Sequence, residues 1–199
     1  LYQTSRYVDI YKALESIAMT RPLTPEERKE AKQYSRLADA FTPLAKGMNS
    51  EYANQNTYDC IQVHGGSGFM MEYACQRLYR DARITSIYEG TTQLQVVAAI
   101  RYVTNGTYAS ILRELEQEPV HEALKPLMDR VVKMTDKLDA VVARTKELTD
   151  ALAAPDAPVD AQDVLDLLSR HLYEIAAVTV MSCLLVRDAS AAPELFATS

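Results

Sequence analysis

The sequence is poor in glycine and proline, with 6 and 8 residues among 199. Tight turns between short strands depend on these two residue types, so their scarcity argues against a fold built from many β-hairpins. Basic residues are not in excess either, since 21 Lys and Arg stand against 27 Asp and Glu. The net charge of −6 argues against nucleic acid as a partner, because neutralising phosphates supplies much of the affinity for nucleic acids.

Cysteines and long apolar runs are also few. The three cysteines, Cys60, Cys75 and Cys183, do not make a disulfide framework and are not spaced like metal ligands. We therefore predict no metal and a reducing, cytoplasmic compartment. The longest apolar run, residues 175–186, is too short to span a bilayer, so we predict no membrane partner. The chain opens without a signal peptide on what reads as the middle of a helix, which suggests a fragment.

Apolar residues make up 48% of the chain and recur at helical spacing. Thr24, Pro25 and Glu27 form the pattern of a capping box, which predicts a helix from there to about residue 64. Asn105 and Gly106 predict the end of a later helix. No segment alternates between apolar and polar residues in the way that β-strands do. We predict an all-α fold, an up-down helical bundle followed by a long helical hairpin.

The net charge of the chain changes near residue 115. Residues 1–114 carry a net charge of +1, whereas residues 115–199 carry −7. From Leu124 to Leu152 apolar residues recur at a spacing of three and four, interrupted only by Thr145, which predicts an amphipathic helix. A linker over 154–158 and a second helix over 160–186 would complete a hairpin. We predict a helical bundle over 1–115 and an acidic helical extension over 116–199.

Three of the six glycines lie together in the segment Gly65-Gly66-Ser67-Gly68. Glycine lets a backbone approach a ligand closely and present its amides to phosphate oxygens, but it also ends helices. The segment is not a Walker loop, because no Gly-Lys-Ser/Thr follows it, and it is not a dinucleotide fingerprint, because no strand precedes it. The residues alone leave both the ligand contact and the helix stop open.

A second segment of interest places Glu89 between the apolar pair Ile87-Tyr88 and Gly90. A carboxylate with such neighbours can be desolvated and can then act as a general base. It can also be an ordinary acid at the start of a helix, favoured by the helix dipole, with Thr91 or Thr92 as the capping residue. Both interpretations stay open at the level of the residues.

These two segments resemble the C-terminal helical domain of the acyl-CoA dehydrogenases. The run Ile-Tyr-Glu-Gly-Thr-Thr-Gln-Leu-Gln over 87–95 is similar to the family's signature around its catalytic glutamate. Residues 51–55 and 59–68 match as well, in the expected order and at the expected separation. The resemblance covers about residues 1–115, and the acidic tail resembles the extra C-terminal helices that some members carry.

The resemblance implies a role for each matching residue. Glu89 matches the base that removes the α-proton of the acyl thioester, and Tyr88 and Gly90 match positions beside the substrate. The residues that match contacts to FAD are Thr91 and Gln93 and, toward the FAD of the neighbouring subunit, Gln62, Val63, His64, Gly65 and Gly66. The implied reaction is α,β-dehydrogenation of acyl-CoA, with the proton taken by Glu89 and the hydride by FAD.

The resemblance also implies partners, namely an electron-transfer flavoprotein and further copies of the chain in a dimer or tetramer. A glutamate at position 89 is associated in this family with unbranched acyl chains. Family members add an N-terminal helical domain and a β-domain, so we expect this chain alone to be inactive and not to retain FAD. Two alternatives are an acyl-CoA oxidase, which passes the electrons to oxygen, and a non-catalytic helical module for oligomerisation.

Overall fold

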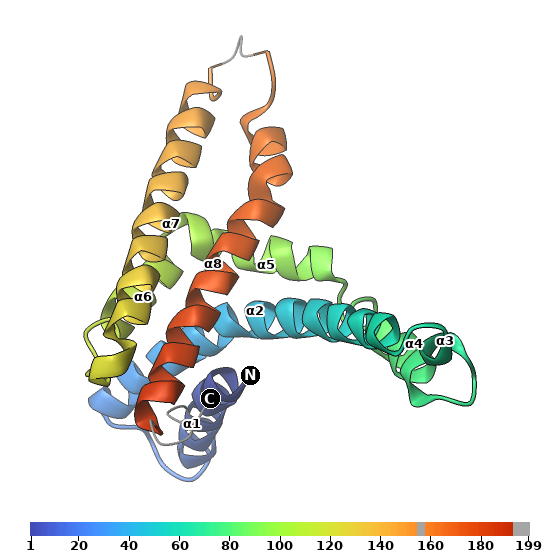
Figure 1. The fold of residues 1–199 in the computed structure, drawn as a ribbon. Coiled ribbons are helices and arrows are strands. Elements are labelled where there is room, and N and C mark those ends of the chain that lie inside the picture. Colours follow the sequence, from blue (N-terminus) through green and yellow to red (C-terminus); the bar gives the residue numbers. More distant parts are fainter. Residues whose placement is uncertain (155–157, 193–199) are drawn as a thin grey trace. The chain divides into compact units, whose positions relative to one another are not determined.

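The computed structural model describes residues 1–154 and 158–192, and these form helices and turns with no β-strand among them (Figure 1). The prediction of an all-α fold is confirmed. The chain divides into two compact units, Leu1–Ala98 and Ala99–Ser199. The change in charge near residue 115 lies inside the second unit, and the domain division predicted from it stays a prediction. Within the described residues, no helix combines the length and the apolar character that a bilayer crossing requires.

The first unit is organised around α2 (Pro25–His64), a helix of 40 residues. The predicted capping box is confirmed: the Glu27 amide donates to Thr24 Oγ1 at 3.2 Å, and the Thr24 amide donates to Glu27 Oε2 at 2.8 Å. Helix α1 (Tyr2–Ala18) packs on α2. The buried ring of Tyr7 meets the ring of Phe41 edge to face at 5.1 Å, so aromatic packing holds α1 in place.

The C-terminal end of α2 carries two further helices (Figure 1). Gly65 ends α2 with a φ of +58°, a conformation that glycine adopts without strain. One turn of helix follows as α3 (Gly66–Phe69), and α4 (Ala74–Thr85) then packs against α2. Residues 71–73 form the turn that precedes α4. After a link over 86–91, α5 (Thr92–Thr104) begins.

The second unit contains the predicted helical hairpin. Helix α6 (Thr107–Leu115) starts directly after Gly106, whose φ of +75° confirms the predicted stop of α5. A single 3-10 turn, η1 (Glu122–Leu124), leads into α7 (Lys125–Ala151), and α8 (Ala161–Ala191) packs along α7. Helix α8 continues five residues beyond the expected end. Of the predicted linker 154–158, residues 155–157 lie outside the described residues.

The predicted apolar stripe of α7 is only partly right. Thr145, expected to interrupt the stripe, is buried, and Thr135 is completely buried. The Thr145 hydroxyl donates to the Val141 carbonyl one turn earlier, whereas the Thr135 hydroxyl donates to the carboxylate of Glu116 at 2.5 Å. A hydroxyl that finds such an acceptor can occupy a core position, which hydropathy does not predict. Leu148, which we counted in the stripe, is exposed.

Candidate functional site

The link between α4 and α5 makes a sharp turn at Glu89 and Gly90. Their φ angles are +52° and +91°, so two successive residues lie in the left-handed region. Glu89 is the only residue other than glycine with a positive φ in the described part of the chain. Such conformations are disfavoured for residues with a side chain and tend to occur at functional sites. Tyr88 and Glu89 line one cleft, and residues before and after the turn line another.

Glu89 and Tyr88 line the first cleft, which we call the Glu89 cleft and which has a volume of about 400 Å³. Its other walls come from α1 and from the middle of α2, including Thr42, Lys46 and Asn49. Lys46 Nζ donates to the carbonyl oxygen of Thr85 and lies 5.4 Å from the centre of the Tyr88 ring. The cation therefore stabilises the C-terminal end of α4 and holds Tyr88 beside the cleft.

The Glu89 side chain is exposed, so this chain alone does not desolvate the carboxylate. Its apolar neighbours Ile87 and Tyr88 are also exposed, with 46% and 49% of their surfaces accessible to solvent. The amide N–H of Glu89 donates to no acceptor within the described residues. The turn thus presents a carboxylate, a free amide and two uncovered apolar side chains at the same place.

The second cleft, which we call the Arg83 cleft, has a volume of about 450 Å³ and is lined by polar groups from α2, α4, the link and α5. Thr91 and Gln93 line it, as do Arg83 and Ser86, and Arg83 Nη1 donates to Ser86 Oγ at 2.5 Å. Thr91 also caps α5, because its Oγ1 accepts from the Leu94 amide at 3.3 Å. The capping role proposed for Thr91 is therefore confirmed, and its hydroxyl proton is still free to donate.

A buried polar atom lies at the wall of the Arg83 cleft. Asn54 Nδ2 donates to the carbonyl oxygens of Ser50 at 2.7 Å and Ala82 at 3.2 Å, which ties α2 to α4. Asn54 Oδ1 is buried and has no hydrogen-bond partner. Sequence reasoning did not single out Asn54, although it lies within the segment 51–55 that matches the family.

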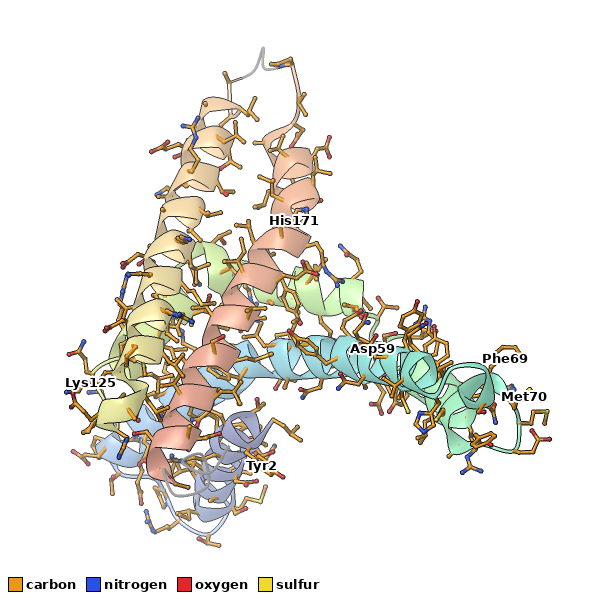
Figure 2. All side chains as sticks on the ribbon, in the orientation of Figure 1. Tyr2, Asp59, Phe69, Met70, Lys125 and His171 are labelled. Carbon is orange, nitrogen blue, oxygen red and sulfur yellow. The ribbon has the colours of Figure 1, made fainter. Side chains whose placement is uncertain are left out.

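The glycine cluster lies apart from both clefts. The five residues predicted to contact FAD in this segment are exposed and line neither cleft: Gln62, Val63, His64, Gly65 and Gly66. Phe69 and Met70, just beyond them, project outward from the turn around α3 (Figure 2). Gly68 differs, because it is buried where α3 approaches the end of α2. The helix stop is confirmed at Gly65, and the contact with FAD stays a prediction.

The structure brings together three side chains that the sequence analysis treated as unrelated. Cys60 Sγ donates to Cys75 Sγ at 3.4 Å, and Cys60 Sγ lies 3.9 Å from His64 Nδ1. Their separation along the chain was misleading, because α4 packs against the end of α2. One signal was available, since Cys60 and His64 are four residues apart and share a helix face.

Two family models match successive parts of the chain. The family described as acyl-CoA dehydrogenase, C-terminal domain, matches residues 18–103, and the family described as acyl-CoA dehydrogenase C terminal matches residues 104–199. The second match covers the acidic hairpin.

Individual relatives match shorter stretches. An acyl-CoA dehydrogenase of Bacillus subtilis is 41% identical over 64 residues, which are 32% of this chain and 17% of that protein. The mitochondrial long-chain specific acyl-CoA dehydrogenase of Sus scrofa is 48% identical over 59 residues, 30% of this chain and 14% of that protein. The caffeyl-CoA reductase-Etf complex subunit CarC of Acetobacterium woodii is 46% identical over 52 residues, which are 26% of this chain and 14% of that protein. The chain thus spans about a sixth or less of the length of these relatives.

Proposed function

The chain belongs to the acyl-CoA dehydrogenase family, and from this premise we propose that it forms the C-terminal helical part of an FAD-dependent enzyme that dehydrogenates acyl-CoA thioesters between the α- and β-carbons. The observation that carries the proposal is the left-handed turn at Glu89 and Gly90. It places the carboxylate at one cleft and leaves the residues matched to FAD contacts, Thr91 and Gln93, at the other.

In this proposal Glu89 is the general base. The α-proton of a thioester is only weakly acidic, so its removal needs a carboxylate and a donor aimed at the carbonyl oxygen, where negative charge develops. The unpaired amide N–H of Glu89 is such a donor on the same residue. Tyr88, held by Lys46, and Gly90 would lie beside the acyl chain.

The exposure of Glu89 sets a condition on this role. A carboxylate in open water is a weak base, and burial next to an apolar surface strengthens it. In the intact enzyme we expect the substrate and the remaining domains to cover Ile87, Tyr88 and Glu89. The exposed apolar side chains on the link are consistent with a surface that another part of the enzyme covers.

The residues around the Arg83 cleft fit part of a flavin cofactor. Thr91 and Gln93 can donate to its polar edge, Arg83 offers a positive charge, and the orphaned Asn54 Oδ1 is an acceptor without a partner. FAD, when bound, supplies the acceptor for the hydride that leaves the β-carbon. Residues 62–66 line neither cleft, which agrees with their proposed contact to the FAD of a neighbouring subunit in a dimer or tetramer.

The remaining proposals concern partners. Electrons would pass to an electron-transfer flavoprotein, which is supported by the name of the relative from Acetobacterium woodii, a subunit of an Etf complex. We propose a cytoplasmic enzyme, on the cysteine content alone.

The 199-residue chain by itself would neither retain FAD nor turn over acyl-CoA, and a stoichiometric flavin absorbance band in the purified chain would contradict this.

The test uses the intact enzyme that contains this chain. Glu89→Gln keeps the size of the side chain and removes the base, so the variant should retain flavin but no longer show flavin bleaching when acyl-CoA is added without oxygen. Glu72→Gln, at an exposed position outside both clefts, is the matched control and should bleach like the wild type. Undiminished bleaching by the Glu89 variant would refute the assignment of the base. Hydrogen peroxide released in air without a carrier protein would identify an acyl-CoA oxidase instead.

A further inference from the structure

Cys60, His64 and Cys75 form a compact group of metal-ligand side chains outside both clefts. Their ligand atoms all lie within 4.8 Å of one another. Cys60 and His64 are one turn apart near the end of α2, and Cys75 is the second residue of α4. We propose that these three side chains form a binding site for a thiophilic divalent metal ion of the Zn²⁺ class. This site goes beyond the dehydrogenase function and does not depend on it.

The distances suit a tetrahedral ion. Bond lengths of about 2.3 Å to sulfur and about 2.0 Å to nitrogen place two sulfur ligands about 3.8 Å apart and a sulfur and a nitrogen about 3.5 Å apart. The observed separations are 3.4 Å between Cys60 and Cys75 and 3.9 Å between Cys60 and His64. Side-chain adjustments of about 0.4 Å bring these two separations to the tetrahedral values, and the third ligand pair lies within 4.8 Å.

The surroundings of the three residues leave one coordination position open. Without a metal, His64 Nδ1 donates to the carbonyl oxygen of Cys60 at 2.9 Å, and the imidazole gives up this hydrogen bond and its proton when that nitrogen coordinates the ion. Cys75 is buried, Cys60 is half-buried and His64 is exposed, so the fourth coordination position faces solvent on the His64 side. Three protein ligands with one open position are a known arrangement for zinc.

The ion would join the end of α2 to the start of α4 across the turn that contains α3. His64 is also one of the residues matched to an FAD contact, and a nitrogen bound to a metal is not free for the flavin. The proposal therefore reassigns His64 and leaves the FAD prediction for Gln62, Val63, Gly65 and Gly66 unchanged.

The test is a titration of the reduced, metal-free 199-residue chain with Co²⁺, which reports tetrahedral thiolate coordination through intense visible absorption bands. We expect the bands to saturate at one equivalent and to be displaced by Zn²⁺. Cys60→Ser and Cys75→Ser should abolish the bands. His64→Ala should weaken Co²⁺ binding at least about tenfold. Because His64 is exposed, this last variant keeps the fold even if a buried serine at position 75 does not.

Cys183→Ser is the matched control. Cys183 is a buried cysteine of α8, in the other structural unit, and should not affect the bands. Bands that persist in a Cys60→Ser/Cys75→Ser double variant, or that disappear in Cys183→Ser, would overturn the proposal. So would a Co²⁺ spectrum of only weak, octahedral type in the wild-type chain. Flavin binding plays no part in this measurement, so its outcome is independent of the proposed dehydrogenase function.

Discussion

The hydroxyl of Thr92 donates a 2.5 Å hydrogen bond to Oε1 of Glu51, which joins the first turn of α5 to α2. Thr92 is buried, and both residues line the Arg83 cleft. The bond therefore fixes the position of α5 directly after the turn that carries Glu89. A hydrogen bond to a carboxylate that is partly removed from water contributes more than a neutral one on the surface.

Thr92→Val should destabilise the first unit. Valine keeps the branched shape but removes the donor, which leaves Glu51 without this partner, and we expect the free energy of unfolding to fall by about 1–3 kcal/mol. Urea unfolding followed by circular dichroism measures this. Thr104→Val is the control on the same helix, because the Thr104 hydroxyl bonds only its own helix backbone at an exposed position. Equal effects of the two variants would show that the Glu51 bond is not a major contributor.

Gly68 should not tolerate even a methyl group. A Cβ at this position would lie 2.8 Å from the carbonyl oxygen of Ile61 and 2.8 Å from His64 Cβ, and the helix backbone cannot yield easily. Gly68→Ala should therefore lower the free energy of unfolding by about 1–3 kcal/mol. Gly66→Ala meets no atom within 4 Å and should be close to neutral. Thermal unfolding of the two variants side by side tests this, and a stable Gly68→Ala protein would contradict the close packing of α3 on α2.

Glu27 should contribute to stability in a pH-dependent way. Its bidentate pair with Arg21 and its bond to the Thr24 amide lower the pKa of the Glu27 carboxyl from its usual 4.5 to about 2. Because the folded-state pKa is the lower one, the stabilisation is present above pH 4.5 and is lost as the pH falls toward 2. The side chains lie at the surface, so solvent reduces the effect.

Glu27→Gln should consequently flatten the loss of stability between pH 5 and pH 2, as followed by urea unfolding at several pH values. Glu26→Gln changes an exposed acid in the same first turn of α2 and serves as the control. If the free energy of unfolding of Glu27→Gln falls with pH as steeply as that of the wild type, the acid sensitivity belongs to other carboxylates.

Thr135 should matter more than Thr145, although both are buried threonines of α7. The Thr135 hydroxyl donates to Glu116 Oε1 at 2.5 Å, and the Glu116 side chain is only 4% exposed. Thr135→Val leaves this carboxylate with Arg113 as its other partner, and we expect a loss of about 1–3 kcal/mol.

The Thr145 hydroxyl bonds only the Val141 carbonyl of its own helix, so Thr145→Val should be neutral or slightly stabilising. Guanidinium unfolding of both variants gives the comparison. A larger loss for Thr145→Val than for Thr135→Val would contradict the role given to Glu116.

Local signals in the sequence were sufficient for most helix boundaries. The capping box of Thr24 and Glu27 and the stop at Gly106 depend on residues within one turn of the boundary, and both are confirmed. The apolar spacing also predicted the hairpin of α7 and α8. The burial of Thr135 and Thr145 was not predicted, because whether a hydroxyl can enter a core depends on the partner it finds there.

The candidate site likewise has some features that the sequence predicted and others that only the structure shows. The sequence by itself determined that a single acid, Glu89, stands at a glycine step between two helices, and that this segment resembles a known family. Only the tertiary structure decided that Tyr88 and Glu89 line one cleft while Thr91 and Gln93 line another, and that Cys60, His64 and Cys75 meet. The physical reason is that helix formation depends on neighbours within about four residues. Clefts and ligand clusters depend instead on which helices pack together, and that contact joins residues far apart in the chain.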